Sequence, residues 1–215
     1  MDRKVISLIG ILGVSLFAIA SVVGGLLVEN YSFLSQYISE SYAIDTEYGV
    51  ALRTFGYIPS GILIAVFCFL AYREFPSSSL TKSGFYGLGI FYGVATTITG
   101  FFPCDSGCNP GFVNPSVSQI IHNLVGMLTY TFAPICIILI GLGLRQSPDY
   151  GKLSRKAITY GTVSMLFVIF LLSNPASNYI GITQRIIESL FVIWIVTCAI
   201  ELIDNPQQMK THSSL

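Results

Sequence analysis

The stretch that decides the fold is VSQIIHNLVGMLTYTFAPICIILIGLGL, at residues 117–144, which contains no Asp, Glu, Lys or Arg. A helix needs roughly 20 mostly apolar residues to cross a bilayer, and this run exceeds that length. The sequence predicts transmembrane helices near residues 5–28, 50–72, 84–102, 117–144, 157–174 and 184–203. We therefore expect an all-α, polytopic membrane protein, a single domain formed by a bundle of six transmembrane helices, with a short tail at 204–215.

The composition agrees with this class of protein. Of the 215 residues, 53% are hydrophobic and 10% are charged, whereas soluble domains carry roughly 25% charged residues. The net charge is zero, so nothing indicates a nucleic-acid partner. The first run contains Ala18-Ile19-Ala20, which is similar to a signal-peptidase site, but the run continues to Val28 and predicts an uncleaved helix.

The positive charges are sorted between the two sides of the predicted bundle. One side holds Arg3, Lys4, Arg73, Lys82, Arg145, Lys152, Arg155, Lys156 and Lys210, and the other holds Arg53 and Arg185. Because Lys and Arg concentrate in cytoplasmic loops, both termini are predicted to be cytoplasmic and the plasma (inner) membrane is the expected location. The outer connections are then about 29–49, 103–116 and 175–183.

Polar side chains gather near the outer ends of the second, fourth and sixth predicted helices. They are Arg53, His122, Asn123, Gln184, Arg185 and Glu188. Such groups are costly against lipid, and three helix N-termini would add positive potential there. The sequence therefore predicts an outer pocket for a lipid or an amphiphilic anion, bound by Arg53, Asn123, Gln184, Arg185 and Glu188. An Arg185–Glu188 salt bridge or ordinary hydrogen bonding between helices are the alternatives.

His122 suggests a second kind of chemistry, because histidine titrates near neutral pH. With Asp105 in the preceding loop it could form a catalytic acid–base pair. A histidine that only forms hydrogen bonds between helices is the alternative. No ligand spacing indicates a metal site, and no phosphate-binding loop or dinucleotide motif is present, so no cofactor is expected.

The outer loop Phe102-Pro103-Cys104-Asp105-Ser106-Gly107-Cys108 is the most distinctive local string. Disulfides persist outside the cytoplasm, so we predict a Cys104–Cys108 disulfide that shapes the turn presenting Asp105. A redox-active pair is the alternative, although such pairs usually have two intervening residues and this one has three.

Glycines recur along the third predicted helix, at Gly84, Gly87, Gly89 and Gly93. Small residues let helix backbones approach each other closely in membranes. We therefore expect this helix to occupy a central place in the bundle.

Several of these strings together resemble a known family. Phe101-Phe102-Pro103-Cys104-Asp105, His122-Asn123 with Gly126, Gln184-Arg185 with Trp194, and the early Leu34-Ser35-Gln36-Tyr37 are similar to the uncharacterised integral membrane family called domain of unknown function 998. The resemblance covers roughly residues 5–203. It implies a six-helix membrane protein and supplies no established activity, hence no catalytic residues.

Three functions remain open at this point. The chain could bind or transport a lipid or another amphiphilic anion in its outer pocket. It could be a membrane-embedded enzyme acting on a lipid headgroup, with His122 and Asp105 as catalytic residues. It could also be a structural or assembly protein, which predicts no cavity at the outer ends. Membrane lipids are the expected partners, and the oligomeric state is left open.

Overall fold

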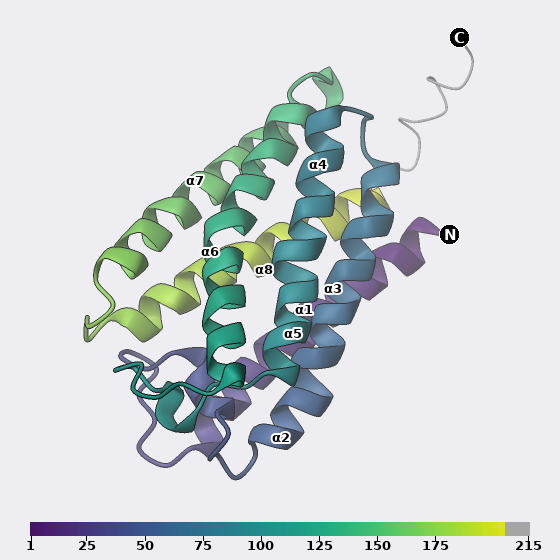
Figure 1. The fold of residues 1–215 in the computed structure, drawn as a ribbon. Helices are drawn as coiled ribbons and strands as arrows, with labels where there is room; N and C mark the ends of the chain where they lie inside the picture. Colours follow the sequence, from purple (N-terminus) through teal and green to yellow (C-terminus); the bar gives the residue numbers. More distant parts are fainter. Residues whose placement is uncertain (205–215) are drawn as a thin grey trace.

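Helices are the only regular secondary structure in residues 1–204, the part of the chain that the computed structural model describes (Figure 1). The α-helices are α1 (Arg3–Leu27), α2 (Gly49–Leu52), α3 (Ile58–Ala71), α4 (Ser79–Leu88), α5 (Ala95–Phe101), α6 (Val117–Leu144), α7 (Gly151–Ser173) and α8 (Ile180–Asp204). Between them lie the 3₁₀ turns η1 (Ile38–Tyr42), η3 (Tyr72–Glu74), η5 (Ser106–Cys108) and η6 (Pro148–Tyr150), and the π-helical segments η2 (Arg53–Tyr57) and η4 (Gly89–Val94). Of the predicted tail, only Asp204 falls within the described residues.

These elements form six helical rods within residues 1–204, because α2–η2–α3 and α4–η4–α5 each run without a break. Five rods are long and apolar enough to cross a membrane: Arg3–Leu27, Gly49–Glu74, Val117–Leu144, Pro148–Ser173 and Ile180–Asp204. The remaining rod, α4–η4–α5, contains Lys82 and many Gly, Thr and Tyr residues, which make it less apolar. The all-α architecture with several membrane-length helices fits an integral membrane protein.

Three helices begin four to six residues earlier than their apolar runs, at Ser79, Gly151 and Ile180. At Ser79 and Gly151 the first turns are polar, and hydropathy locates only the part of a helix that lies in an apolar environment. In α4 the start is fixed by Ser78, whose hydroxyl accepts a hydrogen bond from the Thr81 backbone N–H at 3.0 Å. This is an N-cap, which satisfies one of the free donors of the first turn.

The π-helical segment η2 has a clear local cause in Pro59. Proline has no backbone N–H, and its ring clashes with the carbonyl four residues earlier, which here belongs to Phe55 within η2. Widening the turn there lets the rod continue into α3 without a break.

The third rod lies against both α3 and α6 at very short range, as its glycines predict. A Cβ atom added at Gly93 would lie 2.4 Å from the backbone N of Ala65 in α3. A Cβ added at Gly84 would lie 2.6 Å from the carbonyl oxygen of Cys136 in α6. Backbone contact of this kind requires glycine, and it holds three rods together in the middle of the bundle.

The end of the bundle at which α1, α5 and α7 terminate and α2, α6 and α8 begin is called the outer end below. Residues 28–48 and 102–116 cover it, and they appear as the loops at the lower end of Figure 1. The two loops are joined by the Ile44 N–H, which donates to the Cys104 carbonyl at 3.0 Å, and by the Ser106 hydroxyl, which donates to Asp45. The outer end therefore carries a folded cover.

Candidate functional site

A cavity of about 420 Å³ lies beneath this cover, and it is called the outer cavity below. Its walls come from α1, η1, η2, α5, α6, α7 and α8 and from the loop after Cys104. Four residues singled out from the sequence line it: His122, Asn123, Gln184 and Glu188. The structure therefore brings these polar groups together around one space between the outer helix ends.

One chain of hydrogen bonds runs from the first loop to the wall of the outer cavity. The Ile38 N–H donates to Gln184 Oε1 at 2.7 Å. Gln184 Nε2 donates to the Tyr130 hydroxyl at 2.7 Å, which in turn donates to Glu188 Oε1 at 2.7 Å. Gln184 and Tyr130 each accept a hydrogen bond from the preceding group and donate one to the next. The chain therefore fixes the position of Glu188 and connects η1 to α8.

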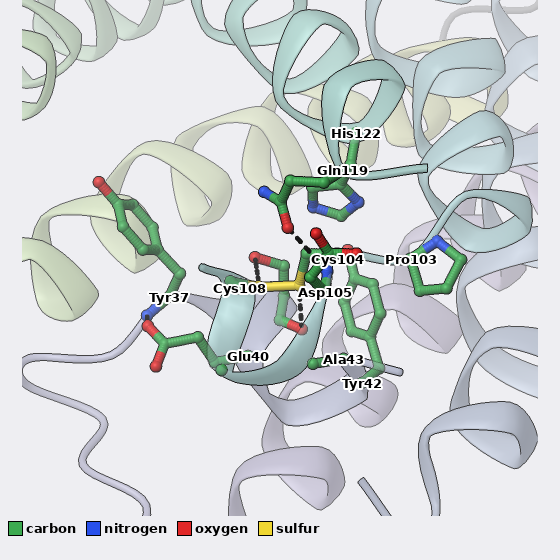
Figure 2. Close-up of a disulfide and its surroundings, with 12 residues drawn as sticks. Tyr37, Glu40, Tyr42, Ala43, Pro103, Cys104, Asp105, Cys108, Gln119 and His122 are labelled. Carbon is green, nitrogen blue, oxygen red and sulfur yellow. Dashed lines mark hydrogen bonds between the residues drawn. A yellow bond between two sulfur atoms is a disulfide. The ribbon is translucent and has the colours of Figure 1, made fainter. Parts of the chain in front are cut away.

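A second chain runs from the other loop in the same manner. The Asp105 N–H donates to Gln119 Oε1 at 2.7 Å, and Gln119 Nε2 donates to Asn123 Oδ1 at 2.8 Å. Figure 2 shows Gln119 reaching from α6 to the loop. This arrangement uses the acceptor of Asn123 and leaves its amide donors for the outer cavity, which Asn123 lines.

Gln119 and Tyr130 were not identified from the sequence as functional residues. Gln119 is fully buried, yet it lies in the first turn of an apolar run, where a polar residue is easily taken as interfacial. The signal that could have found it is the spacing to Asn123, since residues at i and i+4 share one helix face.

His122 lines the outer cavity and is largely buried, with 8% of its surface exposed. Its Nδ1 lies 2.9 Å from the carbonyl oxygen of Phe102. Because a carbonyl can only accept, Nδ1 donates this hydrogen bond, and the backbone of Thr99 also lies within hydrogen-bonding reach of the ring. The ring also lies beside Tyr42, with centroids 6.1 Å apart.

Asp105 lies in a different environment from His122. Its carboxylate accepts hydrogen bonds from the Ser116 hydroxyl and from the Ser116 N–H, and it does not line the outer cavity. Ser116 in turn caps α6, its hydroxyl accepting from the Gln119 N–H at 3.1 Å. Within the described residues no hydrogen bond joins Asp105 to His122, so the predicted acid–base pair is not assembled.

The hydrogen bonds from the Ser116 hydroxyl and N–H lower the pKa of Asp105. A carboxylate whose pKa falls on folding stabilises the protein above its ordinary pKa, near 4, and this contribution is lost as the pH falls through the lowered value. We expect Asp105→Asn to lower the thermal unfolding temperature at neutral pH, with the difference closing below about pH 4.

Thermal unfolding across this pH range measures the effect. Glu47→Gln is the matched control, because Glu47 is exposed and forms no hydrogen bond within residues 1–204. A difference between Asp105→Asn and the wild type that is the same at all pH values would contradict this role.

Neither predicted arginine lines the outer cavity. Arg185 Nη1 donates to the carbonyl oxygens of Phe33, Gln36 and Gly181 at 3.1, 2.9 and 3.0 Å, and Nη2 donates to the Tyr31 hydroxyl at 2.6 Å. Arg53 Nη1 donates to the Tyr42 carbonyl at 2.8 Å. Both guanidinium groups therefore hold loop backbone, which the sequence could not show.

Glu188 has 6% of its surface exposed and does not form the alternative salt bridge with Arg185, whose partners are carbonyls and a hydroxyl. Its Oε1 accepts from Tyr130, whereas its buried Oε2 has no hydrogen-bond partner. The Tyr92 hydroxyl lies beside the carboxylate as a further neutral hydrogen-bonding group, and it has no other partner. Glu188 is thus a buried acid with only neutral neighbours.

The predicted Cys104–Cys108 disulfide is present, with Cα atoms 4.8 Å apart (Figure 2). Gly107 adopts φ 56°, a left-handed conformation that glycine tolerates and that closes the short loop. The Ser39 hydroxyl lies 3.4 Å from Cys108 Sγ, and Cys108 lines the outer cavity. The disulfide therefore forms part of the cover. Among residues 1–204, no group of three or more His, Cys, Asp or Glu side chains could hold a metal ion.

Comparison with known proteins gives one match. The model of the family described as Protein of unknown function (DUF998) matches residues 11–201, which confirms the resemblance seen in the sequence. No curated protein and no solved structure matches the chain. The comparisons therefore identify a family and leave the activity to be argued from the site.

Proposed function

We propose that this chain, which belongs to the DUF998 family, is an integral membrane protein that binds an amphiphilic, lipid-like molecule in its outer cavity. The observation that carries the proposal is the cavity itself, which is lined by both polar and apolar groups. An amphiphile has the same combination, with a polar head and an apolar tail.

The polar side of the outer cavity offers fixed hydrogen-bonding groups. The amide donors of Asn123 remain after its internal hydrogen bond is counted, and the Glu188 carboxylate is an acceptor on the same wall. Ligand sites typically combine a mostly apolar lining with a few oriented polar groups of this kind. A polar headgroup would find both donors and acceptors here.

The apolar side is exposed at the surface of the bundle. Met127 of α6, Phe112 of the loop and Leu172 of α7 line the outer cavity, and they are 50%, 48% and 51% exposed. In a bilayer these side chains would face the acyl chains. An acyl tail could therefore pass between α6 and α7 while its headgroup stays within the cavity.

The other two functions receive less support. The enzyme hypothesis required His122 and Asp105 within hydrogen-bonding reach, and their carboxylate and ring are bonded elsewhere. The structural hypothesis required that no cavity exist at the outer ends, whereas one of about 420 Å³ is present.

We further propose the topology that this function needs. All six rods, including α4–η4–α5, cross the membrane, both termini lie in the cytoplasm, and the outer cavity opens toward the far side of the plasma membrane. The sorting of Lys and Arg supports this orientation. The disulfide in the cover supports it as well, since disulfides persist outside the cytoplasm.

Filling the outer cavity tests the proposed function. A Cβ atom at Gly126 meets nothing within 4 Å, and Gly126 lines the outer cavity. We expect Gly126→Phe to occupy the cavity without disturbing its neighbours, and to reduce the co-purifying amphiphile roughly tenfold or more, as expected when about 1.4 kcal/mol or more of binding free energy is lost. Native mass spectrometry and extraction of bound lipid from detergent-purified protein measure this loss.

Gly151→Phe is the matched control. A Cβ at Gly151 also meets nothing within 4 Å, and this residue begins α7 at the opposite end of the bundle. The control should keep the ligand content of the wild type. Equal ligand content in Gly126→Phe and Gly151→Phe would contradict the proposed function.

A further inference from the structure

We propose that the amphiphile bound in the outer cavity is cationic, carrying an ammonium-type head, and that Glu188 releases its proton when this cation binds. The inference rests on the proposed function and adds the charge of the ligand and a proton exchange. It replaces the anionic ligand that Arg53 and Arg185 suggested in the sequence.

The charged side chains on the wall of the outer cavity favour a cationic ligand. Among the described residues that line the outer cavity, Glu188 is the single acid, and Lys and Arg are absent. The two arginines nearby in sequence direct their guanidinium groups to loop carbonyls. An anionic head would meet no positive side chain on this wall, whereas a cationic head would meet a carboxylate.

Aromatic rings make up a large part of the same wall. They are Phe17, Tyr37, Tyr42, Tyr57, Phe112 and Tyr130. Aromatic faces carry a negative potential, and rings grouped in a pocket bind ammonium groups through cation–π attraction. The rings of Tyr42 and Tyr57 lie 4.3 Å apart and Tyr57 lies 5.6 Å from Phe17, so the grouping is compact.

The surroundings of Glu188 explain why a proton must move. The hydroxyls of Tyr130 from α6, Tyr92 from η4 and Tyr42 from η1 face it, all of them neutral. His122 of α6 is a further titratable side chain on the wall of the same cavity. Its own helix contributes the Gln184 amide to the chain that ends on it. No Lys or Arg within residues 1–204 pairs with Glu188, which has one buried oxygen without a hydrogen bond.

A carboxylate buried without a counter-charge is expensive in a membrane. The protonated acid is therefore the form that the empty cavity favours. A bound ammonium supplies the missing positive charge at short range in a medium of low dielectric constant. The O–H bond of Glu188 then breaks, the proton leaves to the solvent, and the carboxylate and the ammonium remain as an ion pair.

Dodecyltrimethylammonium is a suitable probe, because it has no proton of its own to release. We expect it to bind the wild-type protein in dodecyl maltoside with release of about one proton, and with an affinity that rises with pH, by up to about tenfold per pH unit where Glu188 is protonated in the empty protein. Calorimetry in two buffers of different ionisation enthalpy counts the proton.

Glu188→Gln is the informative variant, because glutamine keeps the acceptor for Tyr130 and cannot ionise. It should bind the probe roughly tenfold more weakly or worse, independently of pH, and release no proton. Release of a proton that persists in Glu188→Gln would assign it to His122 and overturn the inference. Decyl sulfate that binds the wild type as tightly as the cation would overturn it too.

Two further arms separate the possible outcomes. Loss of probe binding in Gly126→Phe, together with preferential binding of decyl sulfate, would leave the proposed function standing and reject the cationic ligand. Probe binding that is unchanged in Gly126→Phe would reject the cavity as the site and both proposals with it. Comparison with dodecylphosphocholine identifies the source: binding with proton release supports a lipid headgroup, and binding of the simple ammonium alone supports a free organic cation.

Discussion

Replacing Gly93 with leucine is expected to prevent the bundle from assembling. A Cβ at this position would lie 2.4 Å from the backbone N and 2.7 Å from the Cα of Ala65. A side chain could rotate away, but backbone atoms within a helix cannot, so α3 and η4 would have to separate. Overpacking costs about 1–3 kcal/mol where side chains can adjust, and contact with backbone places this change at or above that range.

Size-exclusion chromatography of fluorescently tagged protein, with a thermal ramp, measures the loss of folded protein. Gly126→Leu is the matched control, because it adds the same side chain to a helix glycine whose Cβ direction is open. We expect Gly126→Leu to be at least as stable as the wild type, since glycine is a poor helix former. A Gly93→Leu protein with the elution profile and melting temperature of the wild type would refute the central position of the third rod.

The second large effect is expected from Arg185→Gln, through the first loop. The substitution removes donors to Phe33, Gln36 and Tyr31, and it removes a cation that lies 4.9 Å from the centre of the Phe33 ring. Hydrogen bonds from charged groups contribute about 1.5–3 kcal/mol each and are not additive. We expect the free energy of unfolding to fall by about 2–4 kcal/mol. The loss should be largest for local opening of residues 28–37.

Hydrogen exchange of residues 28–37 is the direct measurement, with thermal unfolding beside it. Arg185→Lys keeps the charge but not the fork of donors, so its exchange rates should lie between those of the wild type and Arg185→Gln. Loss of bound ligand in Arg185→Gln with unchanged protection of this loop would contradict the structural role and would favour direct contact with a ligand.

The helical architecture could be predicted because each apolar run is long enough to span a membrane on its own. The predicted bounds were close at 117–144, where Ser116 caps the start. Two predicted helices begin several residues after the observed starts at Ser79 and Gly151. The first turns of these helices are polar, and hydropathy does not detect a helix outside the apolar layer. The π-helical segments were not foreseen, although Pro59 gives η2 a local cause.

The site was predictable in part, for a physical reason. Burying polar groups in a membrane is expensive, so His122, Asn123, Gln184 and Glu188 were expected to face the interior, and they line the outer cavity. The role of Arg185 was not predictable, because its partners belong to a loop roughly 150 positions away whose path is not encoded locally. Because neither Arg53 nor Arg185 lines the outer cavity, the expected charge of the ligand changes from negative to positive.

The central claim is that the outer cavity is a ligand site, and a high-resolution density map of the wild-type protein purified from its own membrane tests it most directly. The account predicts elongated density in the outer cavity, with its head beside Asn123 and Glu188 and its tail leaving between α6 and α7 past Met127. The same map of Gly126→Phe should lack this density. A cavity that holds only water in the wild type, or that is closed by side chains, would contradict the account.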